Sequence, residues 1–342
     1  MEKPDYQPLW RPLVVSSGDH PTFLRNPVNF MHRTVRDFLQ DCYLQRLKSE
    51  LGASSYNPLL SLCNMTLFLL KKLDRNNLSE PHLRRNSIHR TIGLVDELLY
   101  YAHEYEVTEG SSDLVPILDE VDRVNGIHAA GLRNHWTHAR DLPGARGLDE
   151  YREGGNCNFL ALTVQARLVI YVGEKLRLDK TRIHKRGRPL LDYALRPRRV
   201  TPIKMPYHSD REDPSVDVKM VQLLLESGAS PNQKVRLNDG RTVWALFLLS
   251  MYETKNRGED KPDLTKAWYS ACEVLAEHGA DPDCWLDDVQ NMRLTPTSVL
   301  EKVFEPVKAQ RLVMQARHAR EQKARESVFY KIRTGFGWLS SS

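Results

Sequence analysis

The sequence predicts an all-α protein with a helical N-terminal region followed by a short solenoid of paired helices with long inserts. Apolar residues recur at three- and four-residue steps in several segments, for example from Ile92 to Ala102, which is the pattern of an amphipathic helix. A helix-ending segment also occurs twice, at Val221–Asn232 and Val274–Asp283. Internal repetition of this kind is typical of solenoids, in which each unit buries its apolar face against its neighbours.

The composition is that of an ordinary globular protein. The chain has 342 residues, of which 41% are hydrophobic and 27% charged, enough for two or three domains with a real core. The net charge of +5 is small for this length. Nucleic-acid binding usually needs a concentrated basic face, so a nucleic-acid partner is not expected.

Cysteine usage and hydropathy bear on the compartment. None of the five cysteines forms a C-x-x-C pair and their number is odd, which argues against a disulfide framework or a zinc ribbon. The first ten residues contain prolines and acidic residues where a secretory signal needs an apolar stretch. The most apolar run, Leu59–Leu70, is shorter than the about 20 residues of a membrane span. We therefore expect no transmembrane segment and a cytoplasmic, or alternatively nuclear, setting.

The N-terminal part divides into three regions. Residues 1–26 contain four prolines and little periodicity, which predicts extended or loop structure, with a short strand or lead-in after it at Val28–Met31. Region 27–125 is helical, with helices expected at about 33–51, 56–73, 88–105 and 114–124 and a polar connection before the third. Region 126–154 is rich in Gly, His and Arg and predicts a loop-rich boundary.

Region 155–305 contains about four repeats that resemble the ankyrin family. The openings at Gly187–Ala194 and Gly240–Phe247 are similar to the ankyrin opening G-x-T-P-L-H-x-A, and both closings are similar to L-L-x-x-G-A-D-x-N. The outer copies, from Asn158 and from Thr295, are degenerate and predict capping repeats. The residues of each closing suit the end of a helix, because a glycine such as Gly228 tolerates the positive φ that is common there. Thr242 is placed to cap the helix that follows it.

The repeat length departs from the ankyrin pattern. An ankyrin unit has about 33 residues, whereas Gly228 and Gly279 are 51 residues apart. The extra residues fall between the two helices of a unit, within about 196–214 and 254–264. Both segments are polar, so we expect loops, whose length costs little entropy.

The N-terminal region resembles a section of fungal NACHT-type NTPase proteins. The string Phe30–Leu39, F-M-H-R-T-V-R-D-F-L, is similar to a segment at the end of the winged-helix region of those proteins, and helical sections and ankyrin repeats often follow it. The resemblance implies that the chain corresponds to the C-terminal portion of such a protein. The phosphate-binding loop G-x-x-x-x-G-K-[ST] does not occur, so nucleotide hydrolysis is not expected.

The functional prediction is a non-enzymatic scaffold or recognition module with a protein partner. Ankyrin arrays bind through turn tips and the concave face of the first helices, and this resemblance marks seven candidate contact residues: Asp192, Lys234, Arg236, Asn238, Asp239, Arg241 and Ala245. A regulatory fragment of a NACHT-type signalling NTPase is the alternative. No catalytic, metal or cofactor residues are expected, because the histidines around His135 lack a third strong ligand close in sequence.

The segment 306–342 predicts a basic helical tail. Between Val307 and Arg333 it carries eight Lys or Arg residues and two acidic residues. A helix that continues the last repeat explains this pattern most simply. Contact with nucleic acid or with an acidic membrane surface is the remaining alternative.

Overall fold

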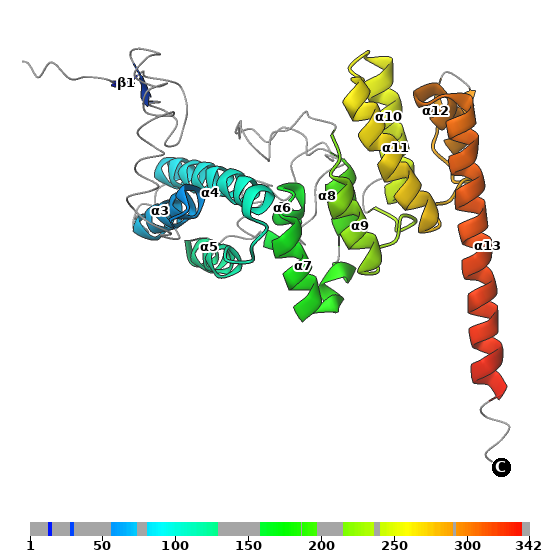
Figure 1. Ribbon diagram of the computed structural model, residues 1–342, viewed down its shortest axis with the longest axis horizontal. Helices are drawn as coiled ribbons and strands as arrows, with labels where there is room; N and C mark the ends of the chain where they lie inside the picture. Colours follow the sequence, from blue (N-terminus) through cyan, green and yellow to red (C-terminus); the bar gives the residue numbers. More distant parts are fainter. Residues whose placement is uncertain are drawn as a thin grey trace, which may run out of the picture.

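The computed structural model describes residues 13–15, 28–30, 56–73, 81–128, 158–185, 187–196, 215–235, 240–289 and 292–336. Within these ranges the chain is predominantly helical, which confirms the all-α class (Figure 1). The strands are short: β1 (Leu13–Val15) pairs antiparallel with β2 (Val28–Phe30), and β3 (Asp287–Val289) pairs antiparallel with β4 (Met292–Leu294). The predicted helix at 33–51 and most of the motif Phe30–Leu39 lie outside the described residues.

Three helices form the N-terminal unit: α3 (Pro58–Lys72), α4 (Pro81–Glu109) and α5 (Val115–His128), with α3 packed on both α4 and α5. Asn57 caps α3 by accepting from the amides of Leu59 and Leu60 at 2.9 and 3.1 Å, as its position before Pro58 predicts. The prediction of a polar connection before the third helix, expected at 88–105, is wrong in part, because α4 begins at Pro81, inside that connection. Proline suits a first helical turn, and polar residues are compatible with one.

The remaining helices form two rows (Figure 1). One row contains α6 (Phe159–Gln165), α8 (Leu190–Leu195), α10 (Val243–Asn256) and α12 (Pro296–Val303). The other contains α7 (Val169–Leu178), α9 (Val218–Glu226), α11 (Pro262–Glu277) and α13 (Pro306–Phe336), with a 3₁₀ turn, η5 (Lys180–His184), after α7. Within each row every helix packs on the next. Taken in chain order, one helix from each row gives four successive pairs: α6 with α7, α8 with α9, α10 with α11, and α12 with α13. The first pair begins at Phe159, next to Asn158, where the first predicted repeat begins.

The glycines of the two closings end α9 and α11. Gly228 and Gly279 have φ values of +102° and +78°, where a side chain is strained and glycine is not. The amide of Ala229 then donates to the Leu224 carbonyl at 2.9 Å, and that of Ala280 to the Leu275 carbonyl at 3.0 Å. The two closings thus have the same backbone geometry, as the repeated sequence predicts.

The second insert is not a long loop. α10 and α11 absorb most of residues 254–264, which leaves only a short connection around Gly258. Apolar side chains continue the buried faces of both helices, with Met251 before the turn and Leu264 and Trp268 after it. The extra residues therefore extend the helices, because the lengthened faces bury apolar surface that a loop would leave in water. Of the first insert, predicted within about 196–214, the structure describes only Arg196, the residue that follows α8.

Residues 306–316 belong to the same core as the helix pairs. Ala309, Leu312, Val313 and Ala316 of α13 are buried against α11 and α12. The division predicted at 305 thus does not coincide with a break in packing, and α13 serves as the second helix of the last pair.

One buried carboxylate joins the N-terminal unit to the first helix pair. Glu106 of α4 accepts from the amides of Ile170 and Tyr171, at 2.9 Å each, in the first turn of α7. Burial raises the pKa of the Glu106 carboxyl, although these amide hydrogen bonds oppose the rise. Nearby, Tyr171 and Lys175 both donate to Asp119 of α5. A negative charge at a helix N-terminus is favourable, so this junction orients the first pair against the N-terminal unit.

Two glycine substitutions separate backbone conformation from packing. A methyl group at Gly228 or at Gly126 meets no atom within 4 Å, but Gly126 lies in α5 without a positive φ. We expect Gly228→Ala to lower the free energy of unfolding by about 1–3 kcal/mol. Gly126→Ala should raise it by about 0.5–1 kcal/mol. Urea denaturation measures both, and similar effects of the two changes would contradict the conformational assignment.

The buried amide of Asn125 in α5 predicts a stabilising substitution. Its side chain is fully buried, and neither Oδ1 nor Nδ2 has a hydrogen-bond partner in the part of the chain that the structure describes. Because a buried polar group without a partner costs about 1–3 kcal/mol, Asn125→Leu should raise the melting temperature. The exposed Asn64 on α3 provides the control, since Asn64→Leu removes no such penalty. A lower melting temperature for Asn125→Leu would show that the amide is satisfied in solution.

Candidate partner-binding surface

The candidate surface is built from two of the connections between helix pairs, the one before α10 and the one before α12. In the first, Lys234 and Thr242 form an isolated antiparallel bridge, and the amide of Val235 donates to the Arg241 carbonyl at 2.9 Å. Thr242 then caps α10 by accepting from the amide of Ala245 at 3.2 Å, as its position predicts. The second connection contains the β3–β4 hairpin. Each connection is therefore a hairpin that leads directly into a capped helix.

The two connections are tied to each other through the second closing. The Asn232 amide donates to the Gly279 carbonyl at 2.7 Å and accepts from the Asp281 amide N–H at 2.9 Å. The indole nitrogen of Trp244 donates to the Asp281 carbonyl at 3.1 Å. These three hydrogen bonds fix the position of the first connection relative to the second closing.

An arginine and a tryptophan from different connections meet on this surface. The guanidinium carbon of Arg241 lies 5.1 Å from the ring centroid of Trp285, a distance at which a cation and an aromatic ring attract each other. The Trp285 side chain is 44% exposed and Arg241 is half-buried. Tryptophan and arginine are both among the residue types enriched at binding hot spots.

The seven predicted contact residues have different positions. Lys234 is exposed and Arg241 is half-buried beside Trp285. Arg236, Asn238 and Asp239 lie outside the described residues. Asp192 and Ala245 are fully buried, so their prediction as contact residues is corrected. Ala245 lies in the first turn of α10, which is packed between α8 and α12.

Asp192 is the centre of a buried ion-pair network. Its carboxylate accepts from Arg188 at 2.5 Å and from Arg196 at 2.6 and 2.7 Å, and all three side chains are at most 3% exposed. Burial disfavours the charged carboxylate, but the two guanidiniums outweigh it and hold the pKa of Asp192 below its usual range. The Arg188 guanidinium also stacks on Tyr193, at 4.1 Å from its ring centroid. Asp192 is therefore a structural residue of α8.

The cations in the middle of α13 hold this helix against the second closing. Arg317 donates to Asp283 at 3.1 Å, Arg320 pairs with Asp281, and the Lys323 ammonium donates to the His278 carbonyl at 2.7 Å. His278 is the last residue before Gly279, so Lys323 also lies at the negative end of the α11 dipole. We call Arg317, Arg320 and Lys323 the α13 clamp. The positive charge of these three residues thus stabilises the terminal helix pair.

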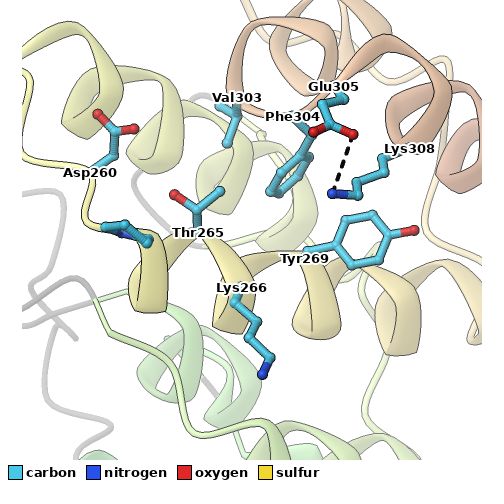
Figure 2. A pocket seen from close by; sticks show the side chains of 9 residues that line it. Asp260, Thr265, Lys266, Tyr269, Val303, Phe304, Glu305 and Lys308 are labelled. Atoms are coloured by element: carbon cyan, nitrogen blue, oxygen red, sulfur yellow. Dashed lines mark ion pairs between the residues drawn. The ribbon is translucent and has the colours of Figure 1, made fainter.

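A second feature lies at the opposite ends of the helices. The connections within the third and fourth pairs border an open hollow of about 460 Å³ with an aromatic base of Tyr269 and Phe304 (Figure 2). Their rings meet edge to face at 5.5 Å. Two charged groups at its edge are paired, Lys308 with Glu305 at 3.4 Å and Asp260 with Lys255 at 2.6 Å, and the exposed Lys266 also lines it. The hollow therefore presents an aromatic base with a charged edge.

No metal site is found in the part of the chain that the structure describes, where no three His, Cys, Asp or Glu residues are placed to hold an ion. Of the histidines noted in the sequence, His128 approaches the Leu70 carbonyl at 2.9 Å, and His135 and His138 lie outside the described ranges. Within those ranges no helix is both long enough and apolar enough to cross a membrane.

No family model, curated protein or solved structure matches this chain. The assignment of a function consequently rests on the geometry described above and on the sequence patterns.

Trp285 is the surface residue that the sequence reasoning missed. The residue directly follows the second closing and stands between Cys284 and Leu286 in an otherwise acidic stretch. A large aromatic residue in a polar connection is a usable signal, because connections of this kind lie at the surface. Its pairing with Arg241, 44 residues earlier in the chain, was not readable from the sequence, since it depends on the stacking of the two units.

The Asp192 network predicts a pH-dependent loss of stability. Removing one partner of a buried ion pair costs about 3–5 kcal/mol, so Asp192→Asn should lower the free energy of unfolding substantially at pH 7. Because the folded pKa of Asp192 is depressed, its contribution is present above the unfolded value of about 3.9 and is lost as the pH falls through the folded value.

Urea denaturation of the wild type and Asp192→Asn between pH 7 and pH 3 measures this effect. The difference between the two proteins should be constant down to about pH 5 and should then shrink. Asp179→Asn, at a half-exposed carboxylate that pairs with Arg182 at 3.3 Å, is the control and should cost less than about 1 kcal/mol. Equal costs for the two variants would contradict a structural role for Asp192.

Proposed function

We propose that the chain is a protein-recognition module, a short ankyrin-type array that binds a protein partner through its hairpin side. The proposal is supported by the two rows of helices, which give four successive pairs, and by the hairpin connections between them. The matched glycine closings and threonine caps are the features that ankyrin units share in sequence. Solenoids of this kind offer extended binding surfaces rather than enclosed pockets.

The observation that carries the proposal is the Arg241–Trp285 pair. Tryptophan and arginine are among the residue types enriched at binding hot spots, and here one of each meets at the surface. Here the Arg241 guanidinium lies over the Trp285 ring, and the next residue in the chain, Leu286, is fully buried. Such an ordered aromatic anchor loses little conformational entropy when a partner covers it.

Site-specific photocrosslinking tests this proposal. A photoreactive phenylalanine analogue in place of Trp285 should give a defined covalent adduct with a protein from the lysate of the source organism. The same analogue at Val307, which is 79% exposed and lies in the first turn of α13, is the matched control at the other end of the helices. An adduct from position 307 but none from position 285 would contradict the assignment of the binding side.

The crosslinked protein, once purified, allows a quantitative test with unmodified variants. Trp285→Ala should weaken its binding by about 30-fold or more, which corresponds to about 2 kcal/mol. Val307→Ala should leave the affinity unchanged, and isothermal titration calorimetry measures both. The melting temperature of Trp285→Ala should change little, because nearly half of the side chain is already exposed. Unchanged affinity for Trp285→Ala would refute the role of this residue.

A further inference from the structure

The C-terminal part of α13 extends beyond the helix pairs. Among the residues of this helix whose side chains the structure describes, those up to Glu326, the last buried one is Ala316, and Lys323 is the last to contact the array, through the His278 carbonyl. Residues 324–326 are exposed, and the backbone remains helical to Phe336. Figure 1 shows this part of α13 alone, past the ends of all other helices. At 1.5 Å per residue, the segment 324–336 projects by about 20 Å; we call it the α13 tip.

The composition of the tip differs from that of the clamp. Between Arg325 and Phe336 there are three aromatic residues in a stretch of twelve, a far higher share than the 8% of the whole chain. Val328, Ile332 and Phe336 are four residues apart and Phe329 adjoins the first, so helical register places these four positions on one side of the helix. Apolar residues on one side of a helix stabilise it only when that side contacts another apolar surface. The pattern therefore suggests that this side of the tip binds a partner.

The charges of the tip indicate which class of partner it suits. Arg325, Lys331 and Arg333 stand against the single acidic residue Glu326, for a net charge of +2. A net charge of +2 is too small for binding along nucleic-acid phosphates, which usually uses many more basic residues. The same charge is sufficient for a helix in a bilayer interface. There apolar and aromatic residues enter the acyl boundary, and a few basic residues meet anionic headgroups.

We propose that the α13 tip binds the surface of an anionic lipid bilayer as an interfacial helix. The clamp and the tip then have separate tasks: Arg317, Arg320 and Lys323 contact the array, and the backbone of the tip continues beyond these contacts. Because α13 is continuous between them, the array orients the helix that meets the membrane. The tip does not span the bilayer, since its apolar stretch is too short. This site is separate from the hairpin surface and does not depend on the proposed protein partner.

Vesicle flotation with the full-length protein tests the proposal. The protein should float with vesicles of 70% phosphatidylcholine and 30% phosphatidylserine, and much less with phosphatidylcholine alone. Raising the salt concentration should weaken binding to the anionic vesicles. Equal flotation with both kinds of vesicle, or none with either, would overturn the proposal.

Two double substitutions separate the apolar and the charged contributions. Phe329→Glu with Ile332→Glu and, separately, Lys331→Glu with Arg333→Glu should each weaken partitioning into the anionic vesicles by at least about tenfold. Met314→Glu is the control for the first, because Met314 is a 70% exposed apolar residue earlier on α13. Lys308→Glu with Arg311→Glu is the control for the second, at exposed positions near the start of the same helix. Circular dichroism and melting temperatures check that all variants fold.

Binding of fluorescent duplex DNA and RNA, measured by anisotropy, tests the competing class of partner. We expect no binding at physiological salt concentration. Nucleic-acid binding that is lost in the Lys331→Glu/Arg333→Glu protein but retained in the Phe329→Glu/Ile332→Glu protein would overturn the lipid assignment. Partitioning into vesicles that is equally weakened by tip and control substitutions would also overturn it, because the effect would then reflect only the net charge or exposed apolar area of the protein.

Discussion

The positive-φ glycines at the ends of α9 and α11 are the constraint on which the rest of the array depends. At Gly228 and Gly279 the chain leaves the helix in a conformation that other residues resist, and the following alanine amide closes the same backbone hydrogen bond in both places. That reversal places Asn232 where it reaches Gly279 and Asp281 of the next unit. The repeated turn therefore fixes how the connections before α10 and α12 begin.

Buried and exposed charges have different roles in this protein. Asp192, between Arg188 and Arg196, is removed from water and orders α8 from within. Glu106 similarly uses a buried carboxylate to satisfy the first amides of α7. On α13, by contrast, partly exposed cations meet the acidic residues and the last carbonyl of the neighbouring closing. A basic stretch in the sequence is therefore not in itself evidence of an anionic ligand, and the proposed lipid contact rests only on the part of the helix beyond these pairs.

The lengthened third unit shows how packing decides the form of an insert. Residues 254–264 are polar in sequence, and polarity is the usual mark of a loop. The face formed by Met251, Thr254, Leu264 and Trp268 is nevertheless buried, and Gly258, at φ +69°, makes the turn between the two extended helices. The longer α11 also brings Thr265 and Tyr269 to the hollow beside the fourth pair.

The sequence by itself determined the helical class, the start of each described helix pair, the cap at Thr242 and the turns at the two glycines. These features depend on local backbone preferences and on the period of apolar residues, both of which are readable along the chain. The tertiary structure decided that Asp192 and Ala245 are buried, that Trp285 meets Arg241, and that α13 belongs to the last pair. Those outcomes depend on contacts between residues far apart in sequence. Whether a polar residue faces water or a neighbouring helix is set by the stacking of units, not by its own neighbours in the chain.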